Sequence, residues 1–436
     1  MKKVLLNFVA LLLITLISCQ KETLNPEETE IAKEEITQKG GAQGANEEGN
    51  ELVILYPDGT TEAEKILKRA EYQIQEFKKC ECADPNLELW IFSKGQTAGG
   101  GLEEKKATAK SDEEIEGAEY NPSIRISEEM FVDYGSVAST DEGVLKRVAS
   151  NQGVTVAVLD TGIMYDYEGF TQPFLYNSSQ NACSNNGQDE LFGWNFVTDD
   201  NNPYDNHYGR HGTIVTKLIA SKLEQANINY QILPVKVADQ TGNIRYFDAL
   251  CGFQFAANKL DVNVINMSFG WHHYNRELLE KFIGEAAANI LVVTSAGNKG
   301  LNNDTTPHYP SSYESENILA IAALGNGNSN SGNQLYNVSI LGGFNSPNGN
   351  SGLANFSNRG TISVDIAAPG ENIPFMYNNG VIYVNGTSYS AALTSGYSGT
   401  LYVDGMSGTA LKAAVIANSI YDTNLSEIQY SKHIPD

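Results

Sequence analysis

An almost continuous apolar run, Val154–Leu159, constrains the fold of this chain more than any other stretch. A run of this length without polar alternation predicts a strand buried on both faces, as in a parallel sheet covered by helices on each side. Asp160 ends the run, so its carboxyl group is expected at the carboxyl edge of the sheet, where open α/β sheets bind their ligands. The chain is therefore expected to contain an α/β domain with an acid at one strand end.

Strand-like and helix-like segments alternate after this run, which predicts a three-layer α/β/α domain with a mainly parallel sheet. The other expected strands are Gln231–Val237, Asp261–Met267, Asn289–Thr294, Ile318–Ala323, Ser363–Ala367 and Val381–Val384. The expected helices are Thr213–Leu223, Tyr246–Leu260, Arg276–Ala288, Ser388–Val403 and Thr409–Ser419. Two long stretches rich in Asn and Gly, residues 165–206 and 325–352, are expected to be surface loops.

Three side chains with complementary chemistry stand at the ends of these predicted elements. His211 lies between glycines where one helix begins, and Ser388 opens another helix after Gly386. A serine hydroxyl is a weak nucleophile that needs a general base, and the base needs a group to orient it. Alone, each residue has an ordinary interpretation as a turn former, a surface histidine or a helix N-cap. Together, Asp160, His211 and Ser388 are the parts of a Ser-His-Asp relay.

The order of these motifs resembles the subtilisin-like serine proteases over about Val144 to Ser419. The motifs that carry the resemblance are Val158-Leu159-Asp160-Thr161-Gly162, His211-Gly212-Thr213, Ser295-Ala296-Gly297-Asn298 and Gly386-Thr387-Ser388. The resemblance implies a serine endopeptidase that works through an acyl-enzyme on protein or peptide substrates. It also implies that Asn298 donates to the oxyanion. By the same resemblance, Ser268, Phe269 and Gly270 form a strand edge for substrate, and Ser295, Ala296 and Gly297 line the pocket before the scissile bond.

The chain departs from the pattern of this family just after the serine. Leu393 stands where a proline is usual, and Tyr389 and Ser390 replace smaller or sulfur-containing residues. These departures keep a second class open, in which a subtilisin-like scaffold binds peptides or proteins with little or no turnover. His207 is a weaker candidate than His211 for the general base, because it lacks the Gly-Thr context.

The first 19 residues have the pattern of a targeting segment. Lys2 and Lys3 precede the apolar run Val4–Ile17, which is too short to span a bilayer comfortably and indicates a signal peptide. The end of this segment resembles a bacterial lipoprotein cleavage box, which implies that Cys19 becomes the lipidated N-terminus and anchors the protein in the cell envelope. The alternative is an ordinary secretory signal. Residues 20–50 are polar and are expected to form a flexible tether.

Residues 51–130 are expected to form a small α+β unit, and residues 131–150 a junction to the catalytic domain at 151–436. The expected strands are Glu51–Tyr56, Leu87–Phe92 and Tyr120–Ile126, with a helix at Thr61–Lys79 and a charged loop at Lys94–Glu116. A unit in this position resembles the prodomain of the family, which implies an intramolecular inhibitor. The alternative is an unrelated adaptor domain. A cut at the junction would release the catalytic domain from Cys19, or the unit would stay attached and keep the enzyme on the membrane.

Charge and cysteine content limit the partners of the chain. A net charge of −24 argues against a nucleic-acid partner, because phosphate binding needs clustered Lys and Arg. The acidic residues Asp199, Asp200 and Asp205 have the oxygen ligands that calcium takes, but a solvated acidic loop is the simpler interpretation. No metal site and no required cofactor are predicted. Cys80 and Cys82 are too close to pair easily with each other, and Cys251 is expected to be a buried thiol or to pair with Cys183.

Overall fold

The structure is a computed structural model that describes residues 49–126, 148–149, 153–178, 182–272, 274–325, 352–377 and 380–435. All of these belong to one compact unit that begins at residue 45. The predicted signal peptide with Cys19, nearly all of the tether and most of the junction lie outside the described residues. No helix in the described part of the chain is long and apolar enough to cross a membrane.

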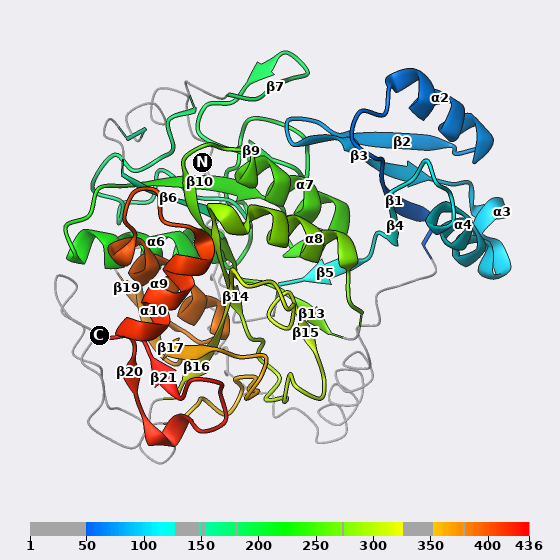
Figure 1. The fold of residues 1–436 in the computed structure, drawn as a ribbon. Helices are drawn as coiled ribbons and strands as arrows, with labels where there is room; N and C mark the ends of the chain where they lie inside the picture. The colour runs from blue at the N-terminus through cyan, green and yellow to red at the C-terminus, as the bar shows by residue number, and fades with distance from the viewer. Residues whose placement is uncertain are drawn as a thin grey trace, which may run out of the picture. The chain divides into compact units, whose positions relative to one another are not determined.

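The largest element is a nine-stranded sheet with the order β20-β21-β17-β16-β14-β12-β6-β10-β9 (Figure 1). Every neighbouring pair is parallel except β20 and β21. Its strands are β6 (Val154–Asp160), β9 (Trp194–Asn195), β10 (Tyr230–Lys236), β12 (Val262–Met267), β14 (Leu291–Ser295), β16 (Ile318–Leu324), β17 (Ile366–Pro369), β20 (Ile420–Tyr421) and β21 (Lys432–His433). All seven residues of β6 are buried, as the apolar run predicts.

Helices cover both faces of this sheet and give three layers. Alternate residues of β6 divide between two hydrophobic cores, with Val156 and Val158 in one and Ala157 and Leu159 in the other. The first core contains α6 (His211–Gln225), α9 (Thr387–Leu401) and α10 (Gly408–Asn418). The second contains α7 (Tyr246–Ala257) and α8 (Glu277–Glu285), the latter continued by η3 (Ala286–Ala288). The predicted three-layer α/β/α class is confirmed.

Short elements complete the domain around the sheet. They are β7 (Ser184–Asn185), β8 (Gln188–Asp189), β11 (Asn243–Arg245), β13 (Trp271–His272), β15 (His308–Tyr309), β18 (Ile373–Tyr377), β19 (Gly380–Val384) and η4 (Thr423–Leu425). The prediction of one long loop at 165–206 is wrong in part, because β9 within it adds an edge strand to the sheet beside β10. The strand predicted at Ser363–Ala367 lies a few residues later, as β17.

The N-terminal unit, residues 49–126 as described, has a four-stranded antiparallel sheet of order β2-β3-β1-β4. Its elements are β1 (Glu51–Leu55), α2 (Glu62–Glu71), β2 (Glu76–Cys80), β3 (Asp84–Ile91), α3 (Lys94–Thr97), η1 (Ala98–Gly100), α4 (Gly101–Lys110), β4 (Gly117–Tyr120) and β5 (Ser123–Arg125). Trp90 and Phe92 are fully buried in a core of their own. The unit therefore has α+β architecture, as predicted.

Three local predictions for this unit are wrong. The helix expected over Thr61–Lys79 ends at Glu71, because Gln73 takes the left-handed conformation and the chain turns into β2. The loop expected at Lys94–Glu116 contains α3, η1 and α4. The strand expected over Tyr120–Ile126 breaks at Pro122, and β5 leaves the sheet of the unit to pair with β11.

Two disulfides join the N-terminal unit to the domain that follows the junction. They link Cys80 to Cys251 and Cys82 to Cys183, with Cα atoms 5.5 and 5.2 Å apart, within the normal range for such bonds. The predictions of a buried Cys251 thiol and of a Cys183–Cys251 pair are therefore wrong. Cys251 and Cys183 each bond to a cysteine of the β2–β3 hairpin. The sequence alone does not show that this hairpin packs beside them.

Candidate active site

Asp160 and His211 form a buried hydrogen-bonded pair at the carboxyl edge of the sheet. Nδ1 of His211 lies 2.8 and 3.0 Å from the two carboxylate oxygens of Asp160. Asp160 is fully buried and ends β6, the third strand from the β9 edge of the sheet, and His211 is the first residue of α6. This contact leaves Nδ1 as the protonated nitrogen of a neutral ring, since a carboxylate only accepts hydrogen bonds. Nε2 is then the nitrogen that can take a proton.

Neighbouring residues fix the start of α6 against the end of β6. A Cβ atom at Gly212 would lie 2.2 Å from Gly162 O and 3.1 Å from Asp160 Oδ1, so only glycine fits there. The backbone N–H of Gly212 donates to Thr161 Oγ1 at 2.8 Å. Asp205 accepts from both the backbone N–H and the hydroxyl of Thr213, at 3.0 and 2.6 Å. These contacts hold the imidazole beside the carboxylate.

Asp205 and Lys236 add buried charge beside the pair. Asp205 is fully buried, and burial raises its pKa, so the prediction that it lies in a solvated acidic loop is wrong. Lys236, opposite Asp160 on β10, donates to Thr161 O at 2.6 Å and to Ala238 O at 2.8 Å. Burial lowers the pKa of Lys236 to about 8, against the attraction of Asp205 and Asp160. A cation here favours the ionised form of Asp205.

Ser388 lies in the first turn of α9, next to the end of β12. Its Oγ donates to Ser268 O at 3.0 Å, and Ser268 Oγ donates back to Ser388 O at 3.0 Å. Gly386 opens the helix with φ of 148°, a conformation that favours glycine. The ring of Tyr389, the next residue, lies 5.7 Å from the ring of His211, centre to centre. Helices α6 and α9 pack together, so their first turns meet at the same edge of the sheet (Figure 1).

Thr387 orients the side chain of Asn298. Asn298 Oδ1 accepts from the backbone N–H and the hydroxyl of Thr387, at 2.9 and 2.8 Å. The hydroxyl of Thr387 also accepts from the backbone N–H of Gly297 at 3.1 Å. Because Oδ1 accepts from Thr387, the amide nitrogen Nδ2 of Asn298 points away from Thr387, and it is the hydrogen-bond donor of this side chain. The sequence motif Ser295-Ala296-Gly297-Asn298 marks Asn298 as a candidate donor. The role of Thr387 was not predicted, although Thr387 lies within the motif Gly386-Thr387-Ser388.

The two predicted substrate segments lie on either side of a buried histidine, His308. A Cβ atom at Gly270 would lie 2.3 Å from His308 Cε1, and one at Gly297 would lie 3.1 Å from His308 Nε2. Ser311 Oγ donates to His308 O at 2.7 Å, so it accepts from His308 Nδ1, 2.9 Å away. Nε2 is then the unprotonated nitrogen. No local motif marks His308, since only the fold brings it beside Gly270 and Gly297.

The remaining predicted substrate residues lie in the same region. Ser268, Phe269, Ser295 and Ala296 are all buried, and Ala296 O accepts from Asn303 Nδ2 at 2.9 Å. His207 is buried as well, and burial lowers its pKa to about 4, with His211 contributing. Its Nδ1 accepts from the backbone N–H of Gly209 at 3.2 Å, a local turn contact.

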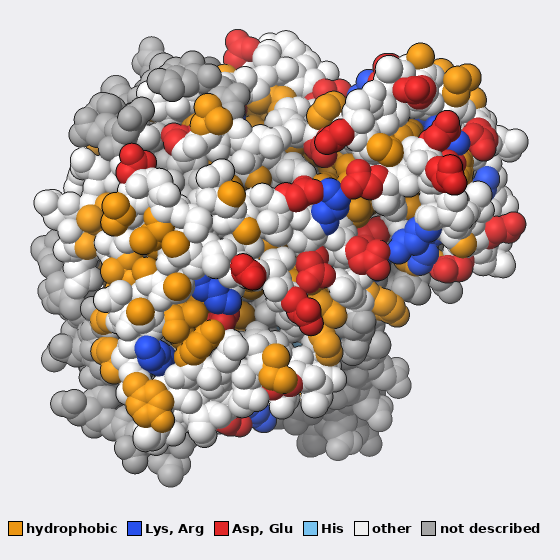
Figure 2. Space-filling view, viewed as in Figure 1, with side chains coloured by type: hydrophobic (Ala, Val, Ile, Leu, Met, Phe, Trp, Pro, Cys, Tyr) orange, Lys and Arg blue, Asp and Glu red, His pale blue; other side chains and the backbone are white. Residues whose placement is uncertain are grey.

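Acidic side chains gather on one face of the molecule (Figure 2). A cavity of about 310 Å³ lies between the N-terminal unit and helices α7 and α8. Asp58, Asp84, Glu116 and Glu285 contribute carboxyl groups to it, and Lys281 contributes an amine. None of the predicted site residues lines this cavity. Within the described residues, no group of three or more His, Cys, Asp or Glu side chains is arranged to hold a metal ion.

Comparison with known proteins places the chain in a family. The Subtilase family matches residues 151–432. A cell wall-associated protease of Bacillus subtilis is 31% identical over 257 residues, which are 57% of this chain and 23% of that protein. A halolysin-like extracellular serine protease of Natrialba magadii is 25% identical over 59% of this chain and 41% of its own length. The chain thus spans less than half of these two relatives. Subtilisin E of Bacillus subtilis is 28% identical over 66% of this chain and 68% of its own length. Among solved structures, a cold adapted subtilisin-like serine proteinase has a TM-score of 0.48 at 19% identity, covering 67% of this chain and 96% of its own. With the family matched over most of its length, this chain belongs to the subtilases.

Proposed function

We propose that the protein is a serine endopeptidase in which Ser388, His211 and Asp160 form the catalytic relay. The observation that carries the proposal is the buried hydrogen bond of 2.8 Å between His211 Nδ1 and Asp160, at the sheet edge where α9 presents Ser388. This contact leaves Nε2 of His211 as the base. Membership of the subtilases and the similarity to subtilisin E support the same activity.

In the proposed reaction, Ser388 Oγ attacks a peptide carbonyl while His211 Nε2 takes its proton. His211 then gives the proton to the leaving amine, and water releases the acyl group by the reverse sequence. Asp160 keeps Nδ1 protonated and stabilises the imidazolium. The hydroxyl of Ser388 donates to Ser268 O here, so the proposal requires it to turn towards His211 when substrate binds. Catalytic hydrogen bonds often tighten only in the complex.

The tetrahedral intermediate needs hydrogen-bond donors that are in position before its charge develops. We assign this role to Asn298 Nδ2 and to the backbone N–H of Ser388 at the start of α9. Thr387 supports the assignment, because its two hydrogen bonds to Oδ1 fix the rotation of the Asn298 amide. A donor held in this way needs no reorganisation during the reaction.

The substrate is proposed to be an extended peptide with a small residue before the scissile bond. Its backbone would pair with the edge formed by Ser268, Phe269 and Gly270, and its side chain would enter between that edge and Ser295–Gly297. The His308 imidazole lies against both Gly270 and Gly297, so it forms the base of this pocket and limits its depth. Burial lowers the pKa of His308 to about 3, with His272 contributing, so the ring stays neutral near pH 7.

The N-terminal unit is proposed to act as an intramolecular inhibitor. Its strand β5 pairs antiparallel with β11, and the backbone N–H of Ile126 donates to Gly242 O at 2.9 Å. β5 occupies the β11 edge, so the unit would exclude any substrate segment that pairs there. We further propose that the protein works outside the cytoplasm, anchored in the cell envelope through a lipidated Cys19.

A serine-reactive fluorophosphonate probe tests the proposed activity. The protein with its connecting chain cut and its N-terminal unit removed is expected to be labelled, and Ser388→Ala is expected to abolish the labelling. Ser390→Ala is the matched control, because Ser390 lies on the same helix and its hydroxyl donates to Pro369 O. The control should label normally. A mature, folded chain that never reacts would favour the alternative function, a subtilisin-like scaffold that binds peptides or proteins with little turnover.

A further inference from the structure

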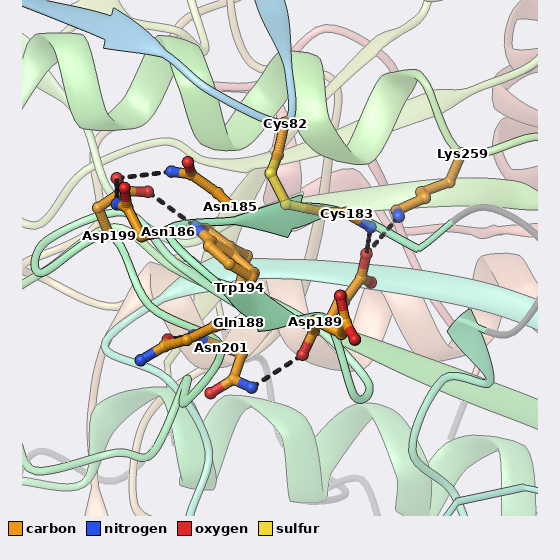
Figure 3. Close-up of a disulfide and its surroundings, with 11 residues drawn as sticks. Cys82, Cys183, Asn185, Asn186, Gln188, Asp189, Trp194, Asp199, Asn201 and Lys259 are labelled. Atoms are coloured by element: carbon orange, nitrogen blue, oxygen red, sulfur yellow. Dashed lines mark hydrogen bonds and ion pairs between the residues drawn. A yellow bond between two sulfur atoms is a disulfide. The ribbon is translucent and has the colours of Figure 1, made fainter.

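The N-terminal unit is attached to the catalytic domain at two points besides the connecting chain. Cys80 lies at the end of β2 and Cys82 two residues later, before β3. Cys80 bonds to Cys251 within α7. Cys82 bonds to Cys183, which lies just before β7 (Figure 3). The bridges join residues 171 and 101 positions apart, and both span the junction at 131–150.

The catalytic domain holds its two cysteines in fixed positions. Cys251 is buried within α7. The backbone N–H of Cys183 donates to Glu190 Oε2 at 2.8 Å, and the same oxygen lies 2.6 Å from Lys259 Nζ (Figure 3). Glu190 and Lys259 are both buried, so this ion pair ties the Cys183 loop to the end of α7. Both bridges therefore end on one rigid part of the catalytic domain.

Non-covalent contacts also join the unit to the catalytic domain. Leu55 and Leu87 of the unit belong to one buried apolar cluster with Phe282 of the catalytic domain. Asn258 Nδ2 donates to Ala83 O at 2.7 Å, beside Cys82. Lys281 Nζ lies 3.2 Å from Glu116 Oε1, and Lys110 Nζ lies 3.3 Å from Glu277 Oε2. Salt screens exposed ion pairs of this kind, and none of these contacts is covalent. The disulfides are independent of salt.

We propose that the two disulfides keep the N-terminal unit covalently bound to the catalytic domain after the chain between them is cut, so that the mature protein has two chains. Cleavage at the junction then does not release the unit. A tethered unit stays at an effective concentration on the order of millimolar and continues to compete for β11. Reduction of both bridges or digestion of the unit is needed to remove it. If Cys19 carries lipid, the catalytic domain also stays at the membrane after cleavage.

An engineered cut tests this proposal without relying on the activity of the protein. The recognition sequence of a site-specific protease is inserted between Thr140 and Asp141 in the full chain carrying Ser388→Ala, expressed in an oxidising compartment. After cleavage, thiols are alkylated and the denatured protein is run on gels. We expect one species of full size without reductant and two fragments with dithiothreitol, which is oxidised to its own disulfide as each bridge takes up two electrons. Separation of the fragments without reductant would refute the proposal.

Single variants assign each bridge. Only Glu81 separates Cys80 from Cys82, so trypsin leaves both in one peptide and peptide mapping cannot distinguish the pairings. Cys80→Ser and Cys82→Ser are each expected to remain linked without reductant, through the other bridge. Release of the N-terminal fragment from either single variant would refute the bridge assigned to the remaining cysteine. The double variant should separate, and if it does not fold, the result for the unaltered cysteines still decides the proposal.

Discussion

Replacing His308 with glycine should change which residue the protein accepts before the scissile bond. The imidazole lies against the Cα atoms of Gly270 and Gly297 and makes the proposed pocket shallow. Its removal opens space between the two substrate segments for a larger side chain. Ser311 Oγ still donates to the backbone carbonyl of residue 308, so its hydroxyl hydrogen bond is kept. The change therefore acts mainly on the volume of the pocket.

The size of the effect follows from the transition-state binding free energy that a pocket gains when it accepts one more apolar group of the substrate. Such a group changes transition-state binding by about 1–3 kcal/mol, which is about 10- to 200-fold in kcat/KM. The protein and its His308→Gly variant, both freed of the N-terminal unit, are compared on peptide nitroanilides that differ only in having Ala or Phe before the scissile bond. The ratio of kcat/KM for Phe to that for Ala should rise by about this factor in the variant. Because each ratio is measured on one protein preparation, a difference in the fraction of active protein between preparations cancels.

His272→Gly is the matched control for this experiment. His272 lies opposite His308 on β13, and the two rings are 4.9 Å apart. Its Nδ1 contacts Pro307 O, and a Cβ atom at Gly270 or Gly297 would meet His308 and not His272. Its removal should leave the Phe-to-Ala ratio unchanged. An unchanged ratio in a folded, active His308→Gly protein would show that the imidazole does not form the base of the pocket.

Three further predictions concern the relay, the oxyanion donor and stability in acid. Asp160→Asn should lower kcat by about 10⁴-fold with little change in KM, because an amide holds His211 in the wrong tautomer, and peptide hydrolysis measures this. Asn298→Ala should lower kcat by about 10²- to 10³-fold, the range known for removing such a donor from subtilisin itself, with Thr387→Val showing a smaller loss. His308 has a pKa of about 3 when folded, far below its value in the unfolded chain. The stability that the neutral His308 ring contributes is fully present above about pH 6.5. That contribution should fall by about 1.4 kcal/mol per pH unit as the pH drops from there towards 3, because the unfolded chain takes up the proton first. Urea unfolding between pH 7 and 5 should show a shallower fall in His308→Asn.

Elements buried on both faces were the easiest to predict from the sequence. The central strands read as continuous apolar runs, so β6, β10, β12 and β14 lie within one or two residues of their expected bounds. Helix α4 was missed because only Leu102 and Ala109 are buried on it, which leaves no apolar stripe in the sequence. The apolar residues of Thr61–Lys79 are spaced as in a helix, but the second half of this segment forms strand β2. Phe77 of β2 packs under the guanidinium group of Arg69.

The residues of the candidate site also differ in how clearly the sequence marks them. Asp160, His211 and Ser388 were identifiable because each stands at the end of an element, within a short local motif. His308 was not, since it reaches Gly270 and Gly297 from a segment with no motif of its own. The disulfide pairing depends on where the β2–β3 hairpin docks, and no local pattern in the sequence encodes that.

The N-terminal unit also completes helices of the catalytic domain, which gives a structural reason for keeping it attached. Neither α7 nor α8 has a side-chain N-cap of its own. Asn121 Oδ1 accepts from the backbone N–H of Phe247 in α7 at 2.8 Å, and Glu119 Oε1 accepts from that of Glu277 in α8 at 2.7 Å. A cap of this kind contributes about 0.5–2 kcal/mol. Loss of the unit would expose both helix starts, which lie beside the proposed substrate edge. Two disulfides on the far side of the same unit oppose that loss after cleavage, so the unit supports the fold of the catalytic domain for as long as the bridges are intact.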